Sequence, residues 1–162
     1  FQFEAADASL ELLMREAAGW LQPWFRLEGY RVTTYHRNAM RGGAPIEDGD
    51  SIIDTEATVK VWAGDERLVA IGEGNGPVNA LDAALRSVLT QRYPALGRIH
   101  LTDYRVRVLE GAAATGAVVR VLIDSTDGDR TWSTVGVSDN VIEASWQALV
   151  DSLVYGLIHA SD

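Results

Sequence analysis

The feature that most constrains the fold of this chain is a glycine-rich turn that leads into a helical pattern and occurs twice. The first copy spans residues 72–85 and the second residues 136–149, a spacing of 136 − 72 = 64 positions. At this spacing small and aliphatic residues align: Gly72 with Gly136, Val78 with Ile142, Ala80 with Ala144, Ala84 with Ala148, Leu85 with Leu149 and Leu89 with Leu153. The repeat predicts one structural unit used twice.

The turn itself predicts a helix start that can bind an anion. Its glycines permit positive φ angles and close backbone approach. Pro77 suits the first helical position, where a missing N–H group removes no hydrogen bond, so Asn75 or Gly76 is expected at the N-cap. The N–H groups that follow have no partner within the helix and can hold a carboxylate.

Hydrophobic patterns predict that each of the two repeated units consists of three strands followed by one helix. The first unit, residues 24–94, is expected to have strands at 24–37, 51–63 and 67–72 and a helix at 77–92. Strand 51–63 alternates between apolar and polar residues, which predicts that Ile53, Thr55, Ala57, Val59 and Val61 face inward. The second unit, residues 99–160, is expected to have strands at 100–110, 117–126 and 131–138 and a helix at 140–159. Short turns at 64–65 and 127–129 indicate hairpins, and hence antiparallel meanders. The predicted fold is α+β, with two pseudo-twofold-related βββα units.

Three other segments carry predictions of their own. Residues 1–23 predict a connector helix, because apolar residues recur there every three or four positions. Its expected buried stripe is Phe3, Ala6, Leu10, Leu13, Ala17 and Leu21. Residues 38–50, rich in glycine and acids, predict a mobile loop. The last helix is apolar on several sides, which predicts burial against both its own sheet and another subunit.

Charge and composition narrow the classes of partner. With 162 residues and 47% hydrophobic content, the chain can form a sizeable core. Its formal net charge of −9 would repel nucleic acid and anionic membranes over most of its surface, so neither is expected as a partner. The absence of cysteine fits a reducing, cytoplasmic setting. The helical pattern at the very start indicates a piece of a longer polypeptide.

Catalytic and cofactor motifs are not found in the sequence. His36, His100 and His159 lack the spacing of a metal site, and the glycines of the first turn lack the G-x-G-x-x-G spacing of a dinucleotide site. No catalytic residue, metal or cofactor is therefore expected in this domain. Helix, three strands and helix is also the order of a double-stranded RNA-binding domain. Because residues 76–82 contain no lysine for a phosphate contact, this alternative is remote.

Three segments resemble a known family. Residues 73–81, 101–109 and 132–149 are similar to the C-terminal regulatory, dimerising domain of the 2-isopropylmalate synthase superfamily. Residues 4–13 and 29–32 look most like the citramalate synthase branch. The resemblance implies that an upstream catalytic (β/α)₈ barrel, which uses acetyl-CoA and a divalent metal, is absent here. The chain alone would then be no enzyme, but the homodimeric part of an acyltransferase that binds a branched-chain amino acid for feedback inhibition.

The resemblance also implies an effector site. An amino-acid zwitterion needs hydrogen-bond donors for its carboxylate, an acceptor for its ammonium group and an apolar slot for its side chain. The start of the first repeat helix would bind the carboxylate, Asp103 or Asp139 the ammonium group, and an apolar slot the side chain. Asn140 and Ile142 would close the pocket, which is expected between the two helix starts. The full set of candidate effector-binding residues is Asn75, Gly76, Pro77, Val78, Asn79, Ala80, Leu101, Asp103, Tyr104, Val108, Val118, Asp139, Asn140 and Ile142.

Several alternatives remain open at this point. Isoleucine would be the effector in the citramalate synthase branch and leucine in the 2-isopropylmalate synthase branch, and a homocitrate synthase relative is a further possibility. A purely structural dimerisation domain without a ligand would have the same repeats. The sequence does not distinguish which half of the duplicated site is occupied.

Overall fold

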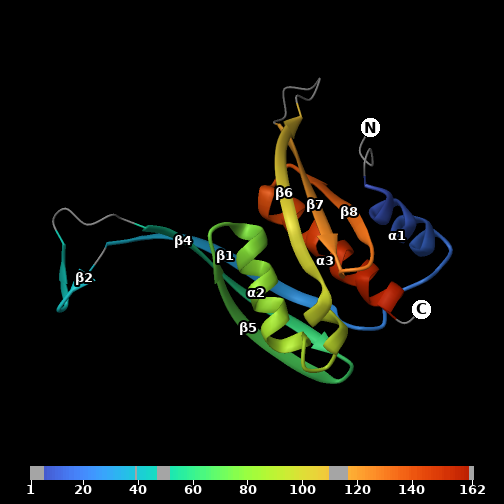
Figure 1. The fold of residues 1–162 in the computed structure, drawn as a ribbon, viewed down its shortest axis with the longest axis horizontal. Coiled ribbons are helices and arrows are strands. Elements are labelled where there is room, and N and C mark those ends of the chain that lie inside the picture. The colour runs from blue at the N-terminus through green and yellow to red at the C-terminus, as the bar shows by residue number, and fades with distance from the viewer. Residues whose placement is uncertain (1–5, 39, 47–51, 110–116, 161–162) are drawn as a thin grey trace. The chain divides into compact units, whose positions relative to one another are not determined.

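The structure is a computed structural model that describes residues 6–38, 40–46, 52–109 and 117–160. Its elements are α1 (Asp7–Ala17), β1 (Arg26–Arg37), β2 (Met40–Arg41), β3 (Ala44–Pro45), β4 (Ile52–Ala63), β5 (Glu66–Gly74), α2 (Pro77–Leu89), the 3₁₀ helix η1 (Pro94–Arg98), β6 (His100–Leu109), β7 (Val118–Thr126), β8 (Thr131–Ser138) and α3 (Val141–Ala160). The α+β class and the order of two three-stranded meanders, each followed by a helix, are confirmed (Figure 1).

The chain divides into two compact units. The β1–β5 unit is Phe25–Val88, and the β6–β8 unit combines Phe1–Trp24 with Leu89–Asp162. Helix α1 thus belongs to the β6–β8 unit. The pseudo-twofold relation between the two units stays a prediction.

The β1–β5 unit is an antiparallel sheet in the order β1-β4-β5. The inward side chains of β4 include Ala57, Val59 and Val61, all fully buried, which confirms the alternation predicted for this strand. On the opposite face, the Glu28 carboxylate accepts hydrogen bonds from Trp62 Nε1 at 3.0 Å and Arg67 Nη2 at 2.8 Å. These bonds fasten β1 to the β4–β5 hairpin.

Helix α2 packs directly on β5 at a glycine. A Cβ atom added to Gly72 would lie 2.5 Å from the carbonyl oxygen of Ala80 and 2.9 Å from the carbonyl carbon of Ala83. A real Cβ atom does not approach a backbone atom so closely, so only glycine fits while the helix stays in place. The described glycines with positive φ are others, such as Gly64 in the β4–β5 turn. The close approach, and not a positive φ angle, therefore explains Gly72.

The β6–β8 unit repeats this arrangement with its own sheet, in the order β6-β7-β8, covered by α3 (Figure 1). A Cβ atom on Gly136 would lie 2.8 Å from the carbonyl carbon of Ala144 and 3.0 Å from the amide nitrogen of Ala148. Gly136, Ala144 and Ala148 correspond to Gly72, Ala80 and Ala84 at the 64-residue spacing. The repeated sequence therefore produces the same helix-on-strand contact in both units.

Helix α1 lies along the free edge of β8, beside α3 (Figure 1). Its buried residues are Ala8, Ser9 and Leu12, preceded by the buried Ala6. The predicted stripe is therefore wrong beyond Ala6: Leu10, Leu13, Ala17 and Leu21 are exposed, and Phe3 lies outside the described residues. The reason is that the contact at a strand edge requires a hydrogen-bonding side chain, so the polar Ser9 faces inward.

Two further differences concern the connections between elements. Part of the segment predicted as a loop at 38–50 forms the short β2–β3 hairpin, and residues 47–50 lie outside the described part. The predicted helix 77–92 ends at Leu89, and η1 follows it. Helix α3 packs on its sheet, on α1 and on η1, and its predicted burial against another subunit stays a prediction. It is long and apolar enough to cross a membrane by composition, but 56% of its apolar 18-residue window is buried in the protein, as in a core helix.

Candidate functional site

An exposed apolar stripe follows strand β6. Tyr104 is in register with Ile123 of β7, which is fully buried on the side of the sheet that faces α3. Because side chains alternate along a strand, Tyr104, Val106 and Val108 lie on this same side. Helix α3 packs against β7 and β8, while these three side chains stay 39%, 49% and 60% exposed, respectively. Together with the half-buried Leu101 they form what we call the β6 stripe.

The start of α2 combines buried apolar groups with a polar rim. The carbonyl of Gly76 accepts the first helical hydrogen bond, from Ala80 N–H at 3.0 Å, which makes Gly76 the N-cap, one of the two predicted alternatives. Val78 and Ala80 are buried. Asn75 Oδ1 accepts a hydrogen bond from Asn79 Nδ2, so the side chain at 75 is used within the turn.

The start of α3 is capped by its own side chain. Asn140 Oδ1 accepts hydrogen bonds from the backbone N–H groups of Ile142 at 2.8 Å and Glu143 at 3.3 Å, and Asn140 O accepts the first helical bond from Ala144. Asn140 is thus the N-cap. Because its amide oxygen already uses two of the N–H groups that an anion would need, α2 offers the better carboxylate position of the two helix starts.

The structure brings together only part of the predicted set. Leu101, Tyr104 and Val108 share one face of β6, whereas Val118 is in register with Leu109 and so points to the opposite face of the sheet. Asp103 is exposed and pairs with Arg105 at 3.6 Å, and Asp139 is exposed at the end of β8. Residues 75–80 belong to the other unit, so a pocket shared between the helix starts stays a prediction.

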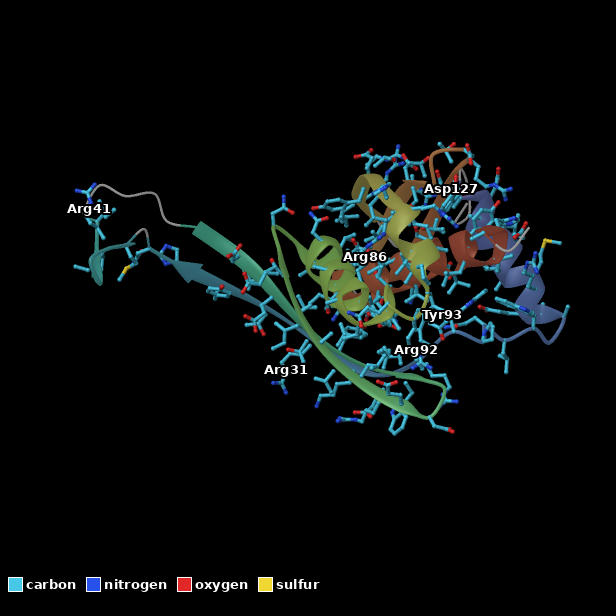
Figure 2. All side chains as sticks on the ribbon, turned by 60° about the horizontal axis from the view of Figure 1, so that its bottom comes forward. Arg31, Arg41, Arg86, Arg92, Tyr93 and Asp127 are labelled. Carbon is cyan, nitrogen blue, oxygen red and sulfur yellow. The ribbon has the colours of Figure 1, made fainter. Side chains whose placement is uncertain are left out.

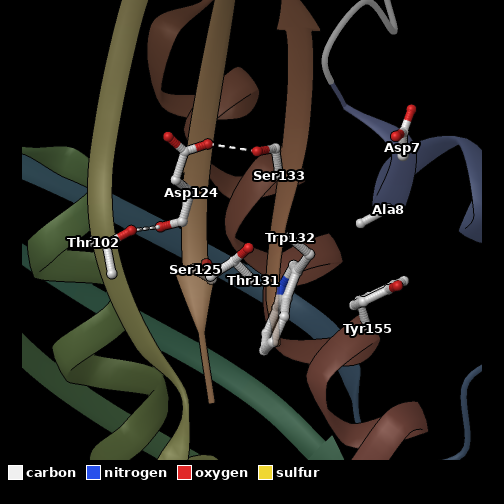
Figure 3. Close-up of a pocket in the computed structure, with 9 residues that line it drawn as sticks. All are labelled: Asp7, Ala8, Thr102, Asp124, Ser125, Thr131, Trp132, Ser133 and Tyr155. Carbon is white, nitrogen blue, oxygen red and sulfur yellow. Dashed lines mark hydrogen bonds between the residues drawn. The ribbon is translucent and has the colours of Figure 1, made fainter. Parts of the chain in front are cut away.

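A polar hollow of about 550 Å³ lies elsewhere in the β6–β8 unit (Figure 3). Thr102, Asp124 and Ser133 line it from the strands, Asp7 and Ala8 from α1, and Tyr155 from α3. Asp124 Oδ1 accepts a hydrogen bond from Ser133 at 2.6 Å, and Asp124 Oδ2 lies 3.4 Å from Arg105 Nη2. The polar groups on the strand side therefore already have partners within the protein.

A second hollow, of about 330 Å³, lies between α1, β8 and α3 and contains the acid Asp151. Ser9 Oγ donates a hydrogen bond to Asp151 Oδ2 at 2.8 Å and accepts one from the Val135 N–H group at 2.9 Å. Burial raises the pKa of Asp151 to about 7, against the lowering effect of the Ser9 hydrogen bond; the nearby Glu16 raises it further. Neither Ser9 nor Asp151 was predicted from the sequence, although Asp151 stands out as an acid within an apolar helix.

The remaining charged groups are mostly solvated. Arg31 on β1 and Arg41 on the β2–β3 hairpin are exposed (Figure 2), whereas Arg86 is partly buried on α2, where its Nε lies 2.7 Å from Asp82 Oδ1. Burial raises the pKa of Asp82 against the effect of this pair. In the part of the chain that the structure describes, no group of three or more His, Asp and Glu side chains could hold a metal ion.

The fold and the β6 stripe together indicate the class of protein to which this chain belongs. Two antiparallel βββα units with matched helix contacts and an exposed apolar strand face form a module for binding or association. Comparison with known proteins identifies the family: residues 4–157 match the LeuA allosteric (dimerisation) domain, and the chain belongs to this family. The predicted relation to this superfamily is thereby confirmed.

Similar proteins agree with this assignment and indicate the branch. The chain is 50% identical over 157 residues, 97% of its length, to an (R)-citramalate synthase of Synechocystis sp., and 50% identical over 161 residues, 99% of its length, to one of Streptomyces coelicolor. It is 35% identical over 96 residues, 58% of its length, to a 2-isopropylmalate synthase of Shewanella amazonensis, 16% of which the match covers. The chain spans about a quarter of the two citramalate synthases, 27% and 28% respectively.

Proposed function

We propose that this domain binds a branched-chain amino acid, with isoleucine as the favoured effector. Binding would inhibit, by feedback, the citramalate synthase-like acyltransferase of which the domain is a part. The observation that carries the proposal is the β6 stripe: Tyr104 and Val108 are exposed apolar side chains on one strand face in a domain of an allosteric family. A branched aliphatic side chain gains binding free energy when it covers such a surface. The two relatives at 50% identity are (R)-citramalate synthases, the branch for which the resemblance implies isoleucine and not leucine.

Each part of the zwitterion has a proposed partner. Leu101, Tyr104 and Val108 would contact the side chain of the amino acid. The backbone N–H groups at the start of α2, at Val78 and Asn79, would bind its carboxylate, because the corresponding groups of α3 are used by Asn140. Asp103 or Asp139 would face its ammonium group.

The parent enzyme and its assembly are part of the same proposal. We expect a cytoplasmic homodimer in which acetyl-CoA and a divalent metal are bound by a catalytic barrel outside this chain. The effector can inhibit only if it binds one of two arrangements of domain and barrel more tightly, since equal affinity shifts no equilibrium. Analytical ultracentrifugation of the chain tests the dimer: a monomer at micromolar concentration with and without isoleucine would contradict it.

Isothermal titration calorimetry with isoleucine, leucine and valine tests the ligand. Tyr104→Ala should weaken isoleucine binding by about tenfold or more, equivalent to ~1.4 kcal/mol. Tyr35→Ala is the matched control, because Tyr35 is also a strand tyrosine and is 36% exposed compared with 39% for Tyr104; it should leave the affinity unchanged.

The outcomes distinguish the alternatives. Preferential leucine binding would favour a 2-isopropylmalate synthase or a related homocitrate synthase. Binding of no amino acid by a folded chain would favour a purely structural dimerisation domain, and salt-dependent binding of duplex RNA would favour the remote RNA-binding alternative. Equal loss of affinity in both tyrosine variants would remove the β6 stripe from the proposed site.

A further inference from the structure

The contact between α1 and the rest of the β6–β8 unit is built around one hydroxyl group. Ser9 Oγ accepts the N–H of Val135 at 2.9 Å, on the edge of β8 that faces α1, and donates to Asp151 Oδ2 on α3 at 2.8 Å. Ser9 itself is only 2% exposed. One side chain thus joins α1 to both the sheet and the long helix, and the carboxyl group of Asp151 is one of its two partners.

Asp151 is half-buried beside α1 and has an acid, Glu16, as its charged neighbour. The hollow around it is lined from α1 by Ser9, Leu12, Leu13 and Glu16 and from β8 and α3 by mainly apolar side chains. An ionised carboxylate in such surroundings is costly because its charge is removed from water. Glu16 adds like-charge repulsion. Movement of α1 away from α3 would expose Asp151 to water and remove both costs.

We propose that α1 is a proton-controlled latch, which docks on β8 and α3 when Asp151 is protonated and opens more readily when Asp151 is ionised. The direction follows from linkage. The docked state raises the pKa of Asp151 from 3.8 to about 7, so it binds the proton more tightly than the open state does. Docking is therefore strongest below pH 3.8 and is progressively lost as the pH rises through about 7.

Other titratable groups lie around this contact and must be separated from Asp151. On α1, Glu11 Oε2 lies 3.1 Å from His159 Nε2 of α3 and 3.4 Å from Arg15 Nε. The His159 contact is an ion pair only when the imidazole is protonated, so a variant at His159 is needed to separate it from Asp151. From β8, the backbone of Val135 faces the hydroxyl of Ser9 and carries no charge.

Amide hydrogen exchange at Val135 measures the latch directly, because the partner of its N–H group is the Ser9 hydroxyl. After correction for the intrinsic pH dependence of exchange, the opening constant at Val135 should rise by roughly 50-fold from pH 5 to pH 7 and level off above pH 8. Val137 is the internal control: its N–H is on the same edge but donates to Gln147 Oε1 at 3.1 Å, so its opening constant should change much less.

Three variants test whether Asp151 causes the pH dependence of the opening constant at Val135. Asp151→Asn should abolish most of the pH dependence at Val135, and Glu16→Gln should move the midpoint to lower pH by removing the like charge. His159→Gln should retain most of the dependence. A pH-independent opening constant at Val135 in the unmodified chain, or an equal pH dependence in Asp151→Asn, would overturn the proposal; a carboxyl NMR titration of Asp151 with a midpoint near 4 would do so without any variant.

Discussion

The glycine contact between α3 and β8 gives the sharpest prediction about stability. In Gly136→Ala, the new Cβ atom would lie 2.8 Å from the carbonyl carbon of Ala144, whereas ordinary contact begins at 3.4 Å. The helix would have to move by 3.4 − 2.8 = 0.6 Å to relieve this contact alone, and by more because the carbonyl oxygen of Ala144 would lie closer still. A shift of α3 disturbs the packing of Leu149 and Leu153, which are fully buried. Overpacking of this kind costs about 1–3 kcal/mol and occasionally more.

We expect Gly136→Ala to lie at the upper end of this range, ~3 kcal/mol, because the opposing atoms are backbone and cannot rotate away. Urea unfolding followed by circular dichroism measures the change, with an unchanged m value. For a chain of this size the melting temperature should fall by about 6–12 °C. Gly29→Ala is the matched control: Gly29 is also a strand glycine, but a Cβ atom there meets nothing within 4 Å.

Two results would refute the reasoning. One is a Gly136→Ala variant that is no less stable than Gly29→Ala. The other is restoration of stability by adding Ala144→Gly to Gly136→Ala, because the predicted clash is with the backbone of Ala144 and removal of its methyl group should not relieve it.

Other predictions concern single contacts. Gly156→Ala should be destabilising by only ~1–2 kcal/mol in urea unfolding, because the atoms that it meets belong to the side chains of Ile99 and Trp132; a loss as large as in Gly136→Ala would contradict this. Hydrogen bonds from Arg67 and Trp62 lower the pKa of Glu28 from 4.5 to about 2, so their contribution to stability is present above pH 4.5 and is lost as the pH falls towards 2. A carboxyl NMR titration should show a higher pKa for Glu28 in Arg67→Ala; an unchanged pKa would show that Arg67 does not cause the shift. The backbone N–H groups of Arg130 and Asp129 lower the pKa of Asp127 below 3.8. Asp127→Ala should therefore reduce the melting temperature fully above pH 3.8 and progressively less as the pH falls through the lowered pKa of the folded state; a reduction that is the same at every pH would exclude a charge-dependent turn.

The fold was predictable from sequence because local patterns and the repeat agree. Strict alternation placed the inward side of β4, and the 64-residue spacing located the two helices and their contacts. The glycines were recognised as sites of close approach or positive φ, and the structure distinguishes the two at Gly72 and Gly136. The 3₁₀ turn η1 was missed because one short turn has no hydrophobic period.

The inward face of α1 was not predictable in the same way. Hydrophobic periodicity assumes that the buried face is the apolar one, but α1 meets the edge of β8, where backbone groups require hydrogen bonds. Ser9 satisfies one of them and the apolar Leu13 is left 46% exposed. Sequence patterns likewise do not show which faces of different elements meet. The structure therefore brings together predicted effector residues within one unit, such as those on β6, and a site shared by the two units stays a prediction.

The measurement that tests the central claim most directly is an NMR titration of the isotopically labelled chain with isoleucine. We expect saturable shifts concentrated at Leu101, Tyr104 and Val108 on β6 and at the amides of Val78 and Asn79 at the start of α2. Shifts that are absent at millimolar isoleucine, or confined to the polar hollow around Asp7 and Asp124, would contradict it.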